Sequence, residues 1–450
     1  MISYILGRKK FLSLSLSLSP RDTMRINVKE TTMVRPMTET PSGSLWLSNL
    51  DLLMPATFHS RSVHLYRSNG AANFFDVALL KAALGRVLVN FYPYAGRLEK
   101  ADNGRIQINC NAEGVLFVEA ECDAVVDDLG DFGHRALDLS LAPKVDYSLE
   151  ISTIPLLILQ LTRFKCGSIS LGIANEHHIS DGTSALHFIS TWSDAARGLT
   201  ATAVPPVLDR RLLSARSPPQ PQFPHDEYQP PPRLTTPLPL PNTDKSHATF
   251  KLTPDHLRAL KQRCKSSYTT YEVVTGHVWR CICAARRLPS DQQSRLQIPM
   301  DARRRLAPPL PPGFFGNVLL FTTSTALCGE LVSNPVEFAV EKVHAALGRI
   351  DDEYLRSAVD YLEVQLSNMH AIARSESNVN CPNFGIVSWV RLPLYPDFGW
   401  GKPVYAGPAA APYEGKGYLF VDGESEGGLL LMITLLNPHM EAFRNLLYHI

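Results

Sequence analysis

Apolar and polar positions alternate along the first half of the chain with two periods, one typical of strands and one typical of helices. Short apolar runs at residues 62–66 and 114–120 predict strands, and residues 75–89 carry apolar side chains at helical spacing. Residues 155–162 are apolar almost throughout, which is typical of a strand buried at the centre of a sheet. This mixture of strands and helices predicts a layered α/β unit.

The second half of the chain repeats the same alternation. Residues 248–252 predict a strand, and a helix is expected to begin at 253–256, where Pro254 suits the first turn. A long helix is predicted over residues 271–286. The further elements predicted here are helices over 330–350 and 354–368, a core strand over 428–436 and a final helix after it.

Length and proline content divide the chain. A chain of 450 residues exceeds what one hydrophobic core usually organises, so two domains of about 200 residues are expected. Prolines crowd between residues 218 and 241, which favours an extended surface linker. The predicted division is a leader at 1–23, an N-terminal domain at 24–215, a linker at 216–245 and a C-terminal domain at 246–450, with a ligand cleft between the two domains.

The first 23 residues differ from the rest of the chain. A basic patch at residues 8–10 precedes an alternation of Leu and Ser over residues 12–19. This alternation is too broken for a secretory signal, whereas a basic, Ser-rich, acid-poor segment also resembles a transit peptide. A third reading, which we favour, is a translated dinucleotide repeat upstream of the true start at Met24. In each case residues 1–23 are expected to lie outside the fold.

Charge and cysteine usage argue against several classes of partner. A formal net charge of +1 gives no support for binding nucleic acid or an anionic membrane surface. No apolar run reaches the ~20 residues of a transmembrane helix. The eight cysteines follow no zinc spacing, so free thiols in a reducing compartment are expected. We therefore expect a cytoplasmic protein without a membrane span.

The segment around His177 carries the first candidate chemistry. A strand-like run at 168–174 leads into His177, which stands four residues before Asp181, and Gly182 follows. Residues 183–192 then carry apolar side chains at helical spacing. This order mounts an imidazole at the end of a strand, beside a turn that glycine permits, which is a suitable position for a general base.

Other chemistries remain open for this histidine segment. The pair His177-His178 could bind a metal, but a third ligand is needed, and the nearby His187 falls on the following helix. The pair could also be purely structural. A nucleophilic triad is disfavoured because no serine here lies in a nucleophile-elbow context.

A second motif, Asp397-Phe398-Gly399-Trp400-Gly401, lies far away in the second half. The two motifs together resemble the BAHD family of plant CoA-dependent acyltransferases, which carry HxxxD and DFGWG. Chloramphenicol acetyltransferases and peptide-synthetase condensation domains share the histidine motif but lack DFGWG. The resemblance covers nearly everything after Met24 and is closest to the hydroxycinnamoyl-CoA:shikimate/quinate hydroxycinnamoyltransferases. The matching stretches are 33–36, 73–76, 91–93, 95–98, 114–118, 186–189, 191–194, 268–279, 312–317, 388–393 and 413–415.

The resemblance implies a fold and a reaction. It implies two similar-sized, mixed-sheet α/β domains, as in chloramphenicol acetyltransferase, with the active site at their interface. By this resemblance the chain is a monomer without metal or redox cofactor, and acyl-CoA is a substrate. His177 is then the general base for direct transfer through a ternary complex. Trp400, through its indole N–H, is the family-based donor to the oxyanion, and Ser60 is a weaker candidate.

The resemblance also assigns supporting residues. Asp181 is expected to turn away from substrate and pair with Arg303, which holds the histidine loop in shape. The remaining structural support is assigned to Gly182, Asp397 and Gly399.

The acceptor side of the expected site matches the family at one residue and departs from it in two segments. Arg391, in Ser-Trp-Val-Arg-Leu-Pro, suits a carboxylate such as that of shikimate or quinate. The shikimate enzymes commonly read His-Thr-Pro-Ser-Val-Tyr where this chain has residues 59–64, His-Ser-Arg-Ser-Val-His. Ser60, Ser62 and His64 are therefore the candidate acceptor contacts there. The segment before DFGWG is also one residue short, over 394–396.

The expected activity is transfer of a p-coumaroyl or caffeoyl group from CoA to a hydroxyl of shikimate or quinate. The alternatives are a BAHD enzyme with another acceptor, such as a hydroxyphenyl-lactate or an amine, and a non-catalytic paralogue that binds acyl-CoA. Arg391 favours a carboxylated acceptor over a polyamine.

Overall fold

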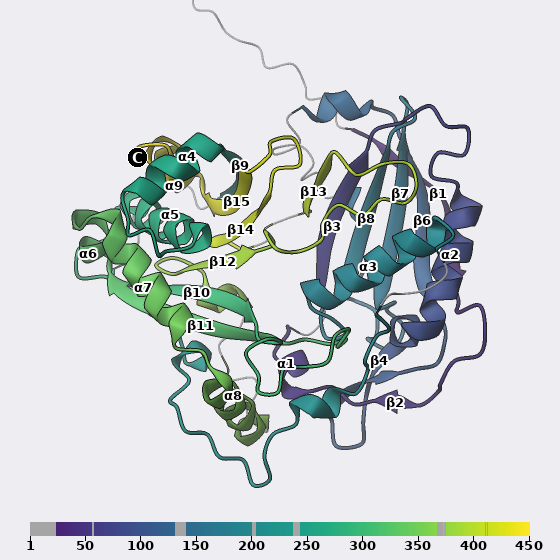
Figure 1. Cartoon of the computed structure of the whole chain (residues 1–450), viewed down its shortest axis with the longest axis horizontal. Coiled ribbons are helices and arrows are strands. Elements are labelled where there is room, and N and C mark those ends of the chain that lie inside the picture. The colour runs from purple at the N-terminus through teal and green to yellow at the C-terminus, as the bar shows by residue number, and fades with distance from the viewer. Residues whose placement is uncertain are drawn as a thin grey trace, which may run out of the picture.

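A computed structural model describes residues 24–55, 58–130, 141–199, 204–236, 244–366, 372, 375–409, 411 and 413–450. The predicted leader at 1–23 lies outside this part of the chain. Within the described residues, no helix has the length and apolarity needed to cross a bilayer. The chain forms two large mixed sheets that face each other across a central region (Figure 1).

The first sheet is built mainly from the N-terminal half. Its strand order is β1-β6-β7-β8-β3-β13, and only the β6–β7 pair is parallel. The strands are β1 (Ile26–Val34), β6 (Val115–Cys122), β7 (Leu157–Phe164), β8 (Ile169–Glu176), β3 (His59–Tyr66) and β13 (Tyr405–Pro408). A small sheet joins β2 (Ser44–Leu45), β5 (Ile106–Asn109) and β4 (Arg97–Lys100). Helices α2 (Val77–Asn90) and α3 (Gly182–Ala196) pack side by side, and both contribute to the core on this sheet.

The second sheet lies in the C-terminal half. Its order is β11-β10-β12-β14-β15-β9, with parallel pairs on both sides of β12. The strands are β11 (Leu319–Leu327), β10 (Gln293–Asp301), β12 (Phe384–Ser388), β14 (Lys416–Val421), β15 (Leu429–Leu436) and β9 (Lys245–Leu252). The helices of this half are α4 (Pro254–Gln262), α5 (Thr270–Arg286), α6 (Cys328–Ser333), α7 (Val336–Gly348), α8 (Asp352–Val364) and α9 (Asn437–Leu447). The fold therefore consists of two α/β domains, each with a mixed sheet, as the resemblance implied.

One strand crosses the predicted domain boundary. β13 belongs to the C-terminal half, yet it pairs with β3 in the first sheet, with Tyr405 opposite Leu65 (Figure 1). Apolar side chains from both halves close a shared core there, including Val63, Phe420 and Met432. The division into 24–215 and 246–450 is thus incomplete, because the first sheet needs a strand from beyond residue 400.

The predicted helix over 330–350 is two helices. α6 ends at Ser333, Asn334 is extended with ψ 162°, and α7 follows Pro335. Proline disfavours helical backbone in the residue before it and lacks the N–H that an interior turn requires. The apolar periodicity continued across this break, so periodicity alone predicted one element.

A short helix of the N-terminal half positions a buried carboxylate. α1 (Asn49–Leu52) carries a capping box in which the Ser48 hydroxyl accepts from the Asp51 N–H, and the Asp51 carboxylate accepts from the Ser48 N–H. This cap fixes Asp51 in the interior, where its carboxylate accepts from the backbone N–H of Asn317 at 2.8 Å.

Candidate active site

Two cavities meet at His177. The larger, about 210 Å³, is lined by residues of both halves of the chain, and the smaller, about 50 Å³, lies against β3 and α3. Five residues line both cavities: Ser60, His177, Gly182, Trp389 and Leu392. His177 follows the last residue of β8, so the end of a strand delivers the imidazole to this junction.

Hydrogen bonds select the tautomer of His177. The amide nitrogen of Asn317 donates to Asp51 Oδ1 at 2.9 Å and to the His177 carbonyl at 2.8 Å. The amide oxygen must then accept, and it lies 3.2 Å from His177 Nδ1. This network assigns the proton to Nδ1 and leaves the Nε2 lone pair for a substrate. Burial lowers the pKa of His177 below 6.5, which favours the neutral imidazole at neutral pH.

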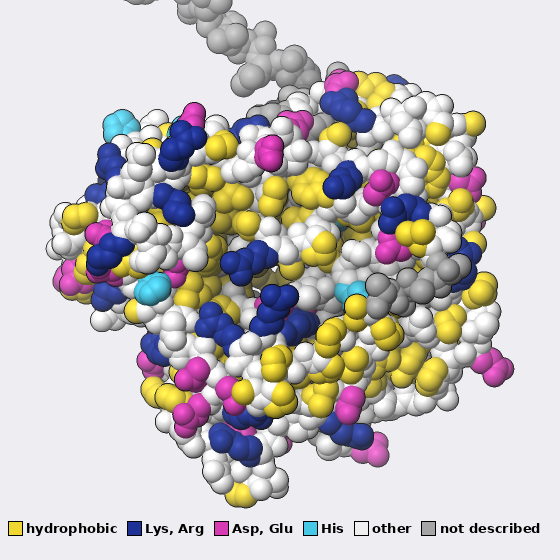
Figure 2. Space-filling view, in the orientation of Figure 1, with side chains coloured by type: hydrophobic (Ala, Val, Ile, Leu, Met, Phe, Trp, Pro, Cys, Tyr) yellow, Lys and Arg dark blue, Asp and Glu magenta, His cyan; other side chains and the backbone are white. Residues whose placement is uncertain are grey.

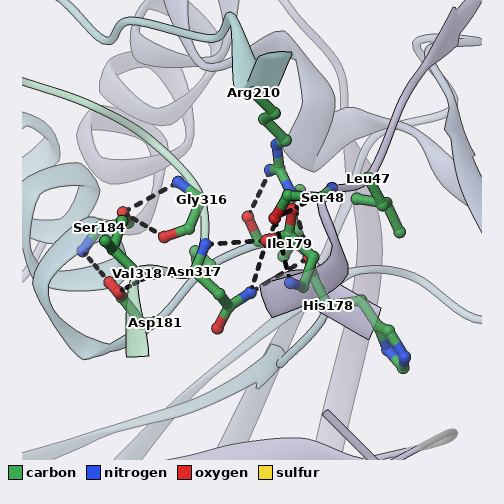
Figure 3. Close-up of polar contacts among 12 residues, drawn as sticks. Leu47, Ser48, His178, Ile179, Asp181, Ser184, Arg210, Gly316, Asn317 and Val318 are labelled. Atoms are coloured by element: carbon green, nitrogen blue, oxygen red, sulfur yellow. Dashed lines mark hydrogen bonds and ion pairs between the residues drawn. The ribbon is translucent and has the colours of Figure 1, made fainter. Parts of the chain in front are cut away.

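The loop after His177 is held by groups that the sequence alone did not reveal. Arg210 pairs with Asp51 at 3.0 Å, and both side chains are 1% exposed. The same guanidinium donates to the carbonyls of His178 and Ile179 at 3.2 and 2.6 Å. Figure 3 shows these contacts converging on the loop with Asn317. Asn317 occurs in a stretch that matches the family, but no spacing in the sequence assigns it to His177.

Asp181 lines the smaller cavity, and its carboxylate binds Arg303. The guanidinium donates to both carboxylate oxygens, at 2.7 and 2.9 Å. Backbone N–H groups of Ser184 and Val318 donate to the same carboxylate at 3.0 and 2.9 Å, so Asp181 also caps α3 (Figure 3). Burial by itself raises the pKa of Asp181, but Arg303 and these donors hold it below its usual value.

Gly182 lies at a close approach between the two halves. A Cβ atom at this position would stand 3.1 Å from Leu392 Cδ1, tighter than ordinary packing allows. Both residues line the two cavities. Glycine therefore lets the segment after β12 reach the start of α3.

The DFGWG segment forms a loop that docks on the N-terminal half. The Asp397 carboxylate accepts from the N–H groups of Gly399 and Gly401 at 2.8 and 2.9 Å. Gly399 has φ +104°, a conformation that side chains with a Cβ rarely adopt. Phe398 is buried with its ring centroid 4.8 Å from that of Trp192.

The structure does not bring Trp400 to His177. Its ring packs 4.9 Å from that of Phe75, and its indole N–H points to Asn73 Oδ1 at 3.4 Å. These contacts lie beyond the Tyr66 end of β3, whereas the opposite end of that strand pairs with the residue before His177. Seven residues of strand separate the two ends by roughly 23 Å. The predicted oxyanion role of Trp400 does not fit this placement, and its packing indicates a structural role.

Trp389 is the tryptophan at the junction of the cavities. It follows β12 and lines both cavities with His177. Its ring contacts that of Tyr418 edge-on at 5.6 Å between centroids. Trp389 lies in the Ser-Trp-Val-Arg-Leu-Pro stretch that also contains Arg391, but no spacing in the sequence places it beside His177.

The three candidates on β3 lie on one side of the strand but differ in exposure. Ser60 and Ser62 line the smaller cavity. His64 lines neither cavity and is fully buried, with Nε2 3.5 Å from the Ser62 hydroxyl. Burial lowers the pKa of His64 to about 4, so this imidazole is neutral at neutral pH.

Arg391 lies at the rim. It is exposed, between Trp389 and Leu392, which line both cavities. Its guanidinium forms no ion pair among the described residues. Lys and Arg side chains also gather on the molecular face between the two sheets (Figure 2). The opening of the site is therefore electropositive, which favours anionic ligands.

The second histidine of the motif has a different setting. His178 lines neither cavity, and its Nδ1 lies 2.7 Å from Glu176 Oε1, with both side chains nearly fully buried. In the part of the chain that the structure describes, no group of three His, Cys, Asp or Glu residues could hold a metal ion. All eight cysteines lie in that part, and each is a free thiol.

The fold and the position of His177 define a two-domain protein of the acyltransferase type. Vinorine synthase has the same fold, with a TM-score of 0.73 and 21% identity over 93% of this chain and 96% of that one. A model of the transferase family matches residues 24–450. The chain belongs to this family, the BAHD acyltransferases.

Relatives within the family are similar over their whole length. Rosmarinate synthase of Plectranthus scutellarioides is 54% identical, covering 95% of this chain and 100% of that protein. Shikimate O-hydroxycinnamoyltransferase of Nicotiana tabacum is 50% identical, covering 94% and 100%. The first name states a product, rosmarinate, and the second states an acceptor, shikimate.

Proposed function

We propose that the protein transfers a hydroxycinnamoyl group from its CoA thioester to a hydroxyl of a small carboxylated acceptor, with shikimate or quinate as first candidates. The observation that carries this proposal is the Nε2 of His177, which has no hydrogen-bond partner among the described residues and lies where two cavities meet. Direct transfer needs two substrates to reach one base from different sides. Relatives named as hydroxycinnamoyltransferases at 50% identity support the acyl group.

The proposed reaction is a general-base-assisted acyl transfer. His177 Nε2 removes the proton of the acceptor hydroxyl as that oxygen forms a bond to the thioester carbonyl. The tetrahedral intermediate then expels CoA as its thiolate, which takes the proton back from the imidazolium. Nδ1 keeps its proton throughout and donates it in a hydrogen bond to Asn317 Oδ1, so the ring stays oriented. The proposed chemistry needs no metal or redox cofactor.

Two further features of the site support this reaction. The Ser60 hydroxyl lines both cavities beside His177, so we assign it as a donor to the oxyanion in place of Trp400. The electropositive opening favours the phosphates of CoA (Figure 2).

Hydroxyphenyl-lactate is the second candidate acceptor. The 54% identity to a rosmarinate synthase favours an acceptor other than shikimate. The β3 segment agrees with this, because Arg61 and His64 replace residues of the shikimate enzymes, and His64 is buried rather than open to the cavity. Arg391 is exposed at the rim in either case and can bind the carboxylate of both kinds of acceptor.

An acceptor screen tests the proposal. The purified protein is given p-coumaroyl-CoA with shikimate, quinate, 4-hydroxyphenyl-lactate or an amine, and free thiol and product mass are followed. We expect acceptor-dependent thiol release with at least one carboxylated alcohol. Turnover with an amine alone would refute the carboxylated-alcohol assignment, and thioester binding without release by any acceptor would support the non-catalytic reading.

Replacement of the base completes this test. His177→Ala is expected to lower kcat by at least about 100-fold, the usual contribution of a general base. The exposed His449 gives a matched control, and His449→Ala should retain wild-type turnover. Undiminished turnover of His177→Ala, at an unchanged thermal midpoint, would remove His177 from the mechanism.

A further inference from the structure

The larger cavity follows one face of the second sheet away from His177. On β10, residues 297, 299 and 301 alternate onto this face, and all three line the cavity. Asp301 lies at the His177 end, because its carboxylate accepts from the Thr183 hydroxyl at 2.9 Å. Gln297 therefore marks the far end, about 13 Å away along the strand.

A lysine stands at that far end. Gln297 on β10 pairs with Gly385 on β12, which pairs with Lys416 on β14, so all three lie in one row across the sheet. Lys416 lines the cavity and is partly buried. Its ammonium has no carboxylate partner among the described residues and lies 6.0 Å from the centre of the Tyr418 ring, and burial lowers its pKa to about 8. A cation in such a place lacks a counter-group that a ligand can supply.

Another polar group at the cavity wall is buried and unsatisfied. Tyr228 comes from the short 3-10 helix of the linker, lines the same cavity and is 3% exposed. Its buried hydroxyl has no hydrogen-bond partner among the described residues. Buried polar groups are nearly always paired, so this unpaired hydroxyl, in the cavity that Lys416 also lines, points to a polar atom of a ligand.

The wall between the two ends is apolar and aromatic. Pro299, Phe321, Val387 and Tyr418 occupy the middle row of the sheet face, between Asp301 and Lys416. The cavity is thus polar at His177, apolar along its length and polar again at its far end. This sequence matches an extended aromatic acyl group whose carbonyl lies at His177 and whose ring carries a hydroxyl at the opposite end.

We propose that Lys416 is the donor-specificity residue of this enzyme and binds the para-hydroxyl of the hydroxycinnamoyl ring. This inference rests on the proposed function, because it assumes that the acyl group occupies the larger cavity. The ammonium donates to the phenolic oxygen, with Gln297 beside it as a second polar group. A cinnamoyl group without this hydroxyl leaves the ammonium unpaired, so the site discriminates against it.

Donor selectivity tests the role of Lys416. Values of kcat/KM are measured for p-coumaroyl-CoA and cinnamoyl-CoA with the wild type, Lys416→Met and Lys416→Arg. Lys416→Met should lower kcat/KM for p-coumaroyl-CoA by about 10- to 100-fold, the range for a hydrogen bond to a charged group, and leave cinnamoyl-CoA within about twofold. Lys416→Arg keeps the cation and should retain most of the preference.

A matched control and a binding measurement separate the alternatives. Lys245 lies on β9 of the same sheet in an exposed ion pair with Glu376, and Lys245→Met should leave the donor ratio unchanged. Dissociation constants of both CoA esters without acceptor test Lys416 even if no acceptor turns over, so failure of the proposed function stays distinguishable. An equal loss for both esters, or a rise only in the KM of the acceptor, would overturn the inference.

Discussion

Replacing Asp181 by alanine tests whether the motif aspartate acts through structure rather than through substrate. Its carboxylate accepts two hydrogen bonds from Arg303 and one each from the N–H groups of Ser184 and Val318. The Asp181 and Arg303 side chains are 0% and 13% exposed. The substitution therefore removes the buried partner of this guanidinium and leaves only Asp301, 3.1 Å away and 40% exposed, as its counter-ion.

The magnitude follows from these contacts. Removing one partner of a buried ion pair lowers the free energy of unfolding by about 3–5 kcal/mol. The lost cap of α3 accounts for about 1 kcal/mol of this loss. At about 2–4 °C per kcal/mol for a domain of this size, the thermal midpoint should fall by roughly 6–20 °C. Replacing Arg303 by methionine as well removes the buried charge that has lost its main partner, so the double variant should regain part of this loss.

Scanning calorimetry and thiol release together give the readout. Asp194 on α3 is the matched control, because its pair with Arg197 is well exposed, and Asp194→Ala should change stability by less than about 1 kcal/mol. We expect Asp181→Ala to retain turnover in proportion to its folded fraction below the midpoint. A variant that unfolds at the wild-type temperature but lacks turnover would show that Asp181 acts on the reaction itself.

Three further predictions concern the proposed site. Burial lowers the pKa of His177, so the base form persists as pH falls, and the acid limb of kcat/KM should have its midpoint below pH 6.5; a midpoint above pH 7 would contradict this. Arg391→Ala should raise KM for carboxylated acceptors by about tenfold and spare uncharged alcohols, whereas an equal rise for both would remove its carboxylate role. Trp400→Phe should lower the thermal midpoint yet keep kcat within about threefold, because an oxyanion donor would cost about 100-fold or more.

Local sequence patterns determined much of this protein. The spacing of His177, Asp181 and Gly182, between an apolar run and a helical period, predicted a strand, a turn and a helix, and the structure has β8 and α3 there. Pairing of Asp181 with Arg303 was also expected from the family resemblance, and the ion pair is present. Such patterns are readable because strand alternation, helical periodicity and caps depend on neighbours in the chain.

The contacts between distant segments were decided by the tertiary structure. Asn317 orients His177 across 140 positions, and Trp389 rather than Trp400 reaches the cavities. The register of three strands sets Gln297 and Lys416 in one row. A motif states which residues are present, but whether a side chain reaches the reacting atoms depends on how sheets pair and pack. That packing buries apolar surface from the whole chain, so no local window of the sequence contains it.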